Sequence, residues 1–267
     1  MIERNPAADR QDQTTTEGEP MSVTRKDRYE IQLPSGAVFP DWSVVTAPAA
    51  EEAMHSILEA FGARERHNGL SRECDAARRA VIQGYVALGR APTAREVAES
   101  ARLPRDVAES ALEELERRDL LVRDGGEIVG AYPFTSRATE HHVTVGNVTV
   151  NAMCAVDALG VGAMLDRDVR IRSACRGCGR TLELTTAECG KSLGAVPDPP
   201  PLVWTGSCYQ ERAATSLCTV IAFFCQADHL AAWRAEHRDL AGYGLSLDEA
   251  MQVGRAIFAP RLTSGGL

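Results

Sequence analysis

Hydrophobic positions in the first half of the chain repeat at the spacing of amphipathic helices. Thr93, with Glu96 three residues later, has the pattern of a capping box and starts a helix that continues to residue 101. Pro104 suits the first position of a further helix, because its missing N–H would be unpaired there in any case. The pattern therefore predicts helices over residues 50–62, 76–88, 93–101 and 104–118.

Short apolar runs follow, on either side of Asp124-Gly125-Gly126, and predict a β-hairpin over residues 120–130. Three helices followed by a hairpin is the element order of a winged helix. The helix at 104–118 would then be the recognition helix, yet five acidic residues on it outnumber three arginines. Such a helix would repel the phosphate backbone. We therefore expect a structural or interaction role for this region rather than nucleic-acid binding.

The second half of the chain predicts a mixture of strands and helices. Residues 142–150 alternate apolar and polar, as a strand does, and Asn151 can cap a following helix over residues 152–165. That helix is apolar on all sides apart from Cys154 and Asp157, so we expect it to be buried. Further strands are predicted at 169–174, 181–184 and 216–225, and further helices at 227–238 and 247–259.

These elements indicate an α+β protein. We expect a winged-helix-like, helical N-terminal domain packed on a mixed or antiparallel β-sheet catalytic domain with flanking helices. The domains would be residues 1–49, a polar extension that is disordered or poorly structured, residues 50–135, the helical domain, and residues 136–267, the catalytic domain.

Composition narrows the class of protein. The 267 residues are 44% hydrophobic and carry a net charge of −8, from 37 acidic and 29 basic residues. This charge again argues against unaided nucleic-acid binding. No apolar run approaches the length of about 18 residues that spans a membrane, and the polar N-terminus does not resemble a secretory signal. We expect a cytoplasmic protein, in which the eight cysteines are free, metal-binding or catalytic thiols rather than a disulfide framework.

Cys154 and Asp157 are the strongest candidates for chemistry. A thiol and a carboxylate three residues apart lie on the same face of a helix. Near the N-terminus of a helix capped by Asn151, the helix dipole would favour a thiolate at Cys154, and burial would raise the pKa of Asp157 toward that of a general acid. A second thiol, from Cys218, would complete a site for a soft, thiophilic metal. The spacing alone fits equally well an Asp157 that bonds a backbone group and a Cys154 that only packs.

Two motifs carry a resemblance to a known family. Met153-Cys154-Ala155-Val156-Asp157-Ala158-Leu159 resembles the helix motif of organomercurial (alkylmercury) lyases that bears the first catalytic cysteine and the aspartate. Ser216-Leu217-Cys218 resembles the strand with the second catalytic cysteine. The resemblance extends to residues 130–135 and 233–258, and covers roughly residues 75–260. It includes the winged-helix-like part, which in this family does not read DNA.

The resemblance implies protonolysis of the carbon–mercury bond, giving a hydrocarbon and Hg(II), for organomercury detoxification. Cys154 would capture the organomercurial, and Cys218 would add a second thiolate and pass its proton to Asp157. Asp157 would protonate the leaving carbon, and all three residues would then hold the Hg(II) product. No cofactor would be required; external thiols or a mercuric reductase would accept the metal.

The chain also departs from the family. Met153 stands where the family commonly has tryptophan, so the substrate pocket would differ in shape. Cys175 and Cys178 form a Cys-x-x-Cys-Gly knuckle that the best-known members lack, and with Cys189 or Cys208 it would hold structural zinc. The alternative is unpaired thiols at a turn.

Other interpretations remain open at this point. His141 and His142 would be surface or core residues rather than ligands. The chain would alternatively be an enzyme of the same fold with a different substrate, or a thiol-based, metal-responsive winged-helix regulator. Asp157 speaks against the regulator, because a sensor has no use for a proton donor.

Overall fold

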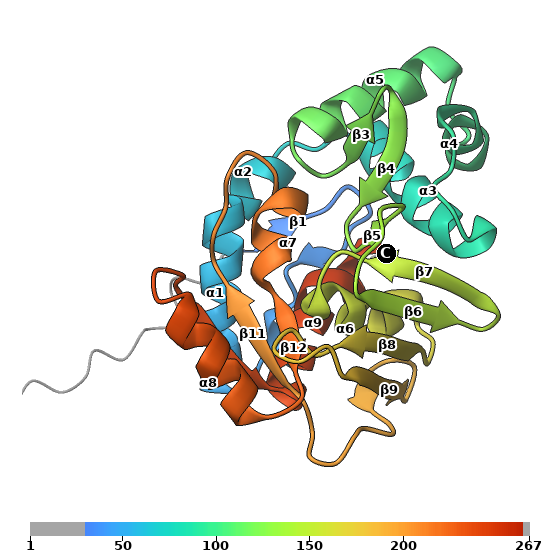
Figure 1. Cartoon of the computed structure of the whole chain (residues 1–267). Coiled ribbons are helices and arrows are strands. Elements are labelled where there is room, and N and C mark those ends of the chain that lie inside the picture. Colours follow the sequence, from blue (N-terminus) through green and yellow to red (C-terminus); the bar gives the residue numbers. More distant parts are fainter. Residues whose placement is uncertain (1–29, 264–267) are drawn as a thin grey trace, which may run out of the picture.

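The structure, a computed structural model, describes residues 30–263 and combines helices with three antiparallel sheets (Figure 1). The α-helices are α1 (Pro48–Phe61), α2 (Ala63–His67), α3 (Arg72–Leu88), α4 (Ala94–Ala101), α5 (Arg105–Arg117), α6 (Ala155–Leu165), α7 (Leu217–Val220), α8 (Ala227–Glu236) and α9 (Leu247–Phe258). The strands are β1 (Ile31–Gln32), β2 (Val38–Phe39), β3 (Val122–Asp124), β4 (Glu127–Ala131), β5 (Phe134–Thr135), β6 (His141–Val145), β7 (Val148–Ala152), β8 (Arg170–Ala174), β9 (Thr181–Ala187), β10 (Ser192–Leu193), β11 (Leu202–Gly206), β12 (Ala222–Phe224) and β13 (Gly242–Ser246). Short 3₁₀ turns are η2 (Trp42–Val44), η3 (Ala213–Thr215) and η4 (Ala259–Arg261).

The helices predicted in the first half of the chain are present, with small changes at their ends. Thr93 and Glu96 form the predicted capping box of α4. Ser71 starts α3 four residues earlier than the apolar pattern indicates, because its hydroxyl accepts the backbone N–H of Cys74. Pro104 is the residue before α5 rather than its first residue. Local capping chemistry therefore sets these boundaries.

An antiparallel sheet of eight strands runs through most of the molecule, in the order β10-β9-β8-β6-β7-β5-β4-β3. The hairpin β3–β4 after α5 has the predicted Asp-Gly-Gly turn. It is not a free-standing wing, because β4 pairs with β5 and β5 pairs with β7. The sheet thus crosses the predicted domain boundary at residue 135. The likeness of the helical region to a winged helix and the domain boundary at residue 135 both remain predictions.

Residues 30–49 correct the prediction of a poorly structured extension. They form the hairpin β1–β2 and the turn η2, with the side chains of Phe39 and Trp42 buried. The Asp41 N–H donates to the carbonyl of Ala256 in α9 (2.9 Å), so this segment is held by a helix more than 200 residues away. The sequence pattern missed it because its partners are distant. The rest of the predicted extension, residues 1–29, lies outside the described residues.

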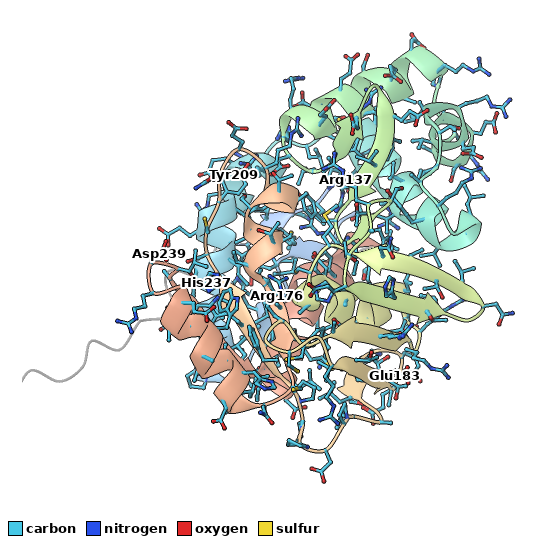
Figure 2. The ribbon with its side chains drawn as sticks, viewed as in Figure 1. Arg137, Arg176, Glu183, Tyr209, His237 and Asp239 are labelled. Carbon is cyan, nitrogen blue, oxygen red and sulfur yellow. The ribbon has the colours of Figure 1, made fainter. Side chains whose placement is uncertain are left out.

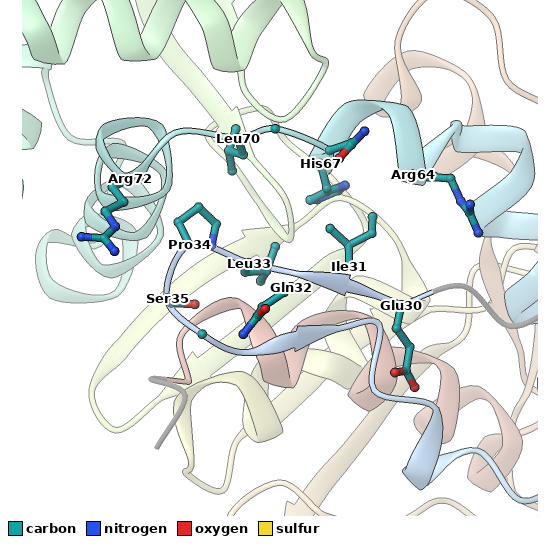
Figure 3. Close-up of a pocket in the computed structure, with 13 residues that line it drawn as sticks. Glu30, Ile31, Gln32, Leu33, Pro34, Ser35, Arg64, His67, Leu70 and Arg72 are labelled. Atoms are coloured by element: carbon teal, nitrogen blue, oxygen red, sulfur yellow. The ribbon is translucent and has the colours of Figure 1, made fainter. Parts of the chain in front are cut away.

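A surface pocket of about 1020 Å³ lies between the β1–β2 hairpin and the chain from α2 into α3 (Figure 3). Figure 3 shows Leu33 of the hairpin facing His67 and Leu70 across it. None of the three candidate reactive residues lines this pocket. It therefore does not belong to the candidate site.

Two predicted strands are wrong in their extent. Residues 142–150 form a hairpin, β6–β7, because Gly146 adopts a left-handed backbone (φ 59°) and turns the chain. Residues 216–225 form the short helix α7 and then β12. The Ser216 hydroxyl donates to the carbonyl of Arg212 (2.6 Å), and such local bonds compete with strand pairing. Strand β12, the part of this segment that is extended, is an edge strand of a three-stranded sheet in the order β12-β11-β13.

Helix α6 is buried on nearly every side, as predicted, and packs against α9. The two helices approach closely at a pair of glycines. A Cβ atom on Gly160 would lie 2.5 Å from the Phe258 ring and 2.6 Å from the Gly254 carbonyl oxygen. Such contacts exclude any side chain at this crossing. No helix within residues 30–263 combines the length and apolar character needed to cross a membrane.

Candidate active site

Helix α6 begins at Ala155, three residues later than predicted, and Cys154 rather than Asn151 is its N-cap. The Cys154 sulfur accepts the backbone N–H of Asp157 (3.4 Å). Asn151 instead belongs to β7, where its side-chain oxygen lies 2.9 Å from Nδ1 of His142. Strand pairing continues through Ala152, which keeps Asn151 extended and moves the cap to the cysteine. The thiol therefore lies at the helix end itself.

The structure brings the three predicted residues together. The sulfurs of Cys154 and Cys218 and a carboxylate oxygen of Asp157 all lie within 4.8 Å of one another, and all three residues are buried. The N–H of Ala155 donates to the carbonyl of Ile221 (3.4 Å), which ties the start of α6 to the segment just after α7. This contact holds Cys218 beside the helix terminus.

The three residues face a small, almost wholly apolar cavity of about 60 Å³. Cys218 also lines a second, larger pocket of about 630 Å³. Met153 lines this outer pocket, as do Arg137 and Arg176, which Figure 2 labels. Cys218 thus lines both the smaller, inner cavity and the larger, outer pocket. Residues lining the inner cavity are Phe39, Ile57, Leu58, Phe61, Tyr132, Cys154, Val156, Asp157, Ala213, Leu217, Cys218, Ile221, Ile257, Phe258 and Arg261.

Burial raises the pKa of Asp157 to about 7, although hydrogen bonds with Cys154 and Cys218 and the charge of Arg261 oppose this rise. Its Oδ2 atom has no hydrogen-bond partner within the described part of the chain. A hydrogen bond to the backbone, the alternative role considered for Asp157, could therefore involve only its other carboxylate oxygen. Asp157 can both take up and give a proton near neutral pH.

The pKa of both thiols is raised, contrary to the expectation of a thiolate at Cys154. Burial raises the pKa of Cys154 well above its ordinary value, and the neighbouring Cys218 and Asp157 add to this effect. The N–H of Asp157 lowers it only in part. A hydrogen bond with Cys154 lowers the pKa of Cys218. Burial and two nearby carboxylates raise it by more than this, so the net shift is upward. For the pKa of Cys154, the loss of hydration on burial therefore has a larger effect than the helix N-terminus.

Asp119 anchors the segment that carries Cys218, a role that the sequence did not reveal. Its buried carboxylate accepts the backbone N–H of Ala213 (2.9 Å) and the hydroxyl of Tyr132 (3.2 Å). The Tyr132 oxygen in turn accepts the N–H of Ala214 (3.0 Å). These bonds connect the end of α5 to the turn before α7. Asp119 is a positioning residue, and only the fold could identify it.

The raised pKa of Asp157 has a consequence for stability. Between about pH 4, where the unfolded chain loses this proton, and about pH 7, the folded protein binds one more proton, so stability falls as the pH rises. One pH unit corresponds to about 1.4 kcal/mol per proton, so the loss is on the order of 4 kcal/mol. The Asp157→Asn variant lacks this titration. In urea unfolding, the free energy of unfolding of the variant relative to that of the wild type should increase by about 3 kcal/mol from pH 5 to pH 8. An equal difference at both pH values would contradict the raised pKa.

A second group of potential metal ligands corrects the predicted zinc set. Cys175 and Cys178 lie together, but their partners are Cys225 and His229, all with ligand atoms within 4.8 Å of one another. Neither Cys189, which is exposed on the turn after β9, nor Cys208, after β11, belongs to this group. The Cys-x3-His spacing of residues 225 and 229 was the signal that the sequence reading missed.

The two consecutive histidines also have clear environments. His141 is buried, and its Nδ1 lies 2.8 Å from the hydroxyl of Ser173. His142 bonds Asn151 on the neighbouring strand. Neither belongs to a group of potential ligands among residues 30–263.

Part of the chain is similar in sequence to known alkylmercury lyases. Residues 134–259 match the family model described as alkylmercury lyase. The alkylmercury lyase of Bacillus cereus is 27% identical over 134 residues, which are 50% of this chain and 60% of that protein. The alkylmercury lyase of Streptomyces lividans is 26% identical over 187 residues, or 67% of this chain and 80% of that protein. The chain thus spans about three fifths of the Bacillus relative's length.

A crystal structure of the mercury-bound form of MerB2 is similar in fold, with a TM-score of 0.64 at 23% sequence identity. The similarity covers 81% of this chain and 100% of that one. The fold is therefore the mixed α+β fold of that protein. Residues 134–259 thus resemble the alkylmercury lyase family, and the curated relatives that the chain matches carry the same name.

Proposed function

We propose that this protein is an alkylmercury lyase that cleaves carbon–mercury bonds by protonolysis. One observation carries the proposal: two buried thiols and a carboxyl with a pKa of about 7 converge on one point. Thiolates are the preferred ligands of a soft metal such as mercury. A carboxyl that titrates near neutral pH can deliver the proton that the leaving carbon needs. The set thus combines metal capture with acid catalysis.

The reaction would proceed in three steps. The Cys154 thiol exchanges its proton for the metal, forming a sulfur–mercury bond with R–Hg⁺ and releasing H⁺. The Cys218 thiol then gives its proton to ionised Asp157 and bonds to the same mercury as a thiolate. Finally the mercury–carbon bond breaks, its electron pair stays with carbon, and Asp157 protonates that carbon to give R–H. Hg(II) remains on the two sulfurs, with the Asp157 carboxylate beside it.

Burial supports each of these steps. The mostly apolar lining of the inner cavity would strengthen the interaction between the carboxyl and the developing carbanion, because apolar walls compete little with it for hydrogen bonds. The inner cavity of about 60 Å³ has room for a small apolar group. The outer pocket, which shares Cys218 with it, gives a route for the organomercurial. Met153 in this outer pocket would modify which organic groups are accepted.

Release of the product requires an acceptor with competing sulfur ligands. Hg(II) held by two protein thiolates exchanges readily only with other thiols, because thiolates are its favoured ligands. External thiols, or the thiols of a mercuric reductase, would therefore remove the metal. The chemistry as written needs no organic cofactor.

Benzene release from phenylmercury in excess thiol tests the proposal. The wild type should release benzene continuously, and Cys154→Ser and Cys218→Ser should lose at least about 100-fold of this rate, because oxygen is a poor ligand for a soft metal. Cys189→Ser is the matched control, since Cys189 is exposed and outside the site, and it should retain the wild-type rate. Tight Hg(II) binding by the wild type without benzene release would instead favour the metal-responsive regulator. Release from another substrate class only would favour a same-fold enzyme with a different substrate.

A further inference from the structure

We infer that Cys175, Cys178, Cys225 and His229 form a structural zinc site, separate from the mercury chemistry. The four residues come from two parts of the fold. Cys175 and Cys178 belong to the turn between β8 and β9, Cys225 follows β12, and His229 is in the first turn of α8. Three thiolates and one imidazole are a ligand set typical of structural zinc.

The distances fit a tetrahedral metal. With the usual zinc–ligand bond lengths, a regular tetrahedron has S···S edges of about 3.8 Å and S···N edges of about 3.6 Å. The sulfurs of Cys178 and Cys225 lie 3.8 Å apart, and the Cys175 sulfur lies 3.6 Å from Nδ1 of His229. The Cys225 sulfur is 3.1 Å from the same nitrogen, an edge that must lengthen by about 0.5 Å. Rotation of the half-buried imidazole can supply this. A disulfide would need sulfurs about 2.05 Å apart.

The backbone around the cluster is shaped for metal binding. The N–H of Cys225 points at the Cys175 sulfur (3.3 Å), a contact that stabilises a thiolate. The N–H of Gly179 donates to the Cys175 carbonyl (2.8 Å), which closes the knuckle. A Cβ atom on Gly177 would lie 2.8 Å from Cβ of His229, so only glycine lets the histidine helix approach the knuckle this closely. The absence of a side chain at Gly177 thus allows His229, the fourth ligand, to come close to the three cysteines.

The imidazole also has an outer partner. The amide nitrogen of Gln226 lies 3.1 Å from Nε2 of His229. With the amide turned by 180°, its oxygen accepts the Nε2–H and leaves Nδ1 free to bind the metal. Oriented histidines of this kind are the rule in zinc sites.

The site would be structural rather than catalytic. Four protein ligands fill a tetrahedral zinc shell, so no position is left for water or substrate. Binding would displace three thiol protons and join the β8–β9 turn to the start of α8. Cys178 is exposed, which lets the ion reach the site from solvent. None of the four ligands belongs to the set around Cys154.

Metal analysis of the full-length protein, purified without added metal, tests this inference. We expect one zinc ion per chain in the wild type, and a small fraction of that in Cys178→Ser and His229→Ala. His229→Cys should restore the zinc, because a Cys₄ set also binds it tetrahedrally. Replacing zinc by Co(II) should give the visible absorption of a tetrahedral thiolate site in the wild type and in His229→Cys.

Two controls separate this site from the proposed active site. The double variant Cys154→Ser/Cys218→Ser should keep its zinc, and so should Cys189→Ser, which changes an exposed cysteine outside both clusters. A wild type that contains no zinc and takes up neither Zn(II) nor Co(II) would overturn the inference. So would zinc that persists in both Cys178→Ser and His229→Ala, or zinc that is lost from the double variant. None of these results depends on lyase activity.

Discussion

Replacing Asp157 by asparagine is expected to slow benzene release from phenylmercury by roughly 10²–10⁴-fold, the usual contribution of a general acid. The amide cannot take the proton of Cys218 or give one to carbon, while the two sulfurs remain in place. Capture of the organomercurial should therefore persist. Mass spectrometry of the intact protein after one equivalent of phenylmercury should show a stable phenylmercury adduct on Asp157→Asn, but Hg(II) without phenyl on the wild type.

The size of the side chain is the main concern in this experiment, and asparagine matches aspartate closely. Asp157→Asn should fold at least as stably as the wild type above pH 7, because it lacks a buried carboxylate. Asp166→Asn, at the exposed end of the same helix, is the matched control and should release benzene normally. Wild-type turnover by Asp157→Asn would exclude this carboxyl as the proton donor.

The largest expected loss of stability is at Asp75→Ala. Asp75 and Arg78 form an ion pair in α3 (2.5 Å) in which both side chains are almost completely buried. Two guanidinium nitrogens of Arg78, Nε and Nη1, have no hydrogen-bond partner within residues 30–263. Removing the carboxylate would leave the cation buried without its counter-charge. We expect the free energy of unfolding in urea to fall by about 3–5 kcal/mol.

Two further variants show whether the charge, rather than the packing, is responsible. Asp75→Ala/Arg78→Met removes both charges and should recover most of the lost stability, since apolar replacements of buried pairs are often neutral. Glu99→Ala breaks the pair with Arg95, in which both side chains are about two-thirds exposed (65% and 66%). It should change stability by less than about 1 kcal/mol. An equally small effect at Asp75→Ala would mean that water reaches Arg78.

Elements with local causes could be predicted from the sequence. The capping box of Thr93 and Glu96 depends only on residues within one helix turn, and α4 begins where it indicates. The all-round apolar pattern of α6 indicated a buried helix, and the structure has one. The turn at Gly146 also had a local signal, but strict alternation over the flanking residues hid it.

Features with distant causes could not be predicted in this way. The hairpin at residues 30–39 is too short to be recognised without α9, against which the following turn is held. The proximity of Cys154 and Asp157 could be predicted, because the two residues are only three positions apart in the sequence. Cys218 was expected on a strand and lies on α7 instead, so its approach to the pair depends on tertiary contacts such as the one at Ala155. The direction of the Cys154 pKa was wrong because burial cannot be judged from spacing.

The walls of the inner cavity come from both sides of residue 134, where the family match begins. Cys154, Asp157 and Cys218 lie within the matched part, whereas Phe39, Phe61 and Tyr132 on the cavity wall precede it. Part of the surface that would accommodate the organic group is thus encoded outside the stretch that carries the three candidate reacting residues. Substitutions in the earlier stretch alone would therefore reshape this cavity while leaving Cys154, Asp157 and Cys218 unchanged.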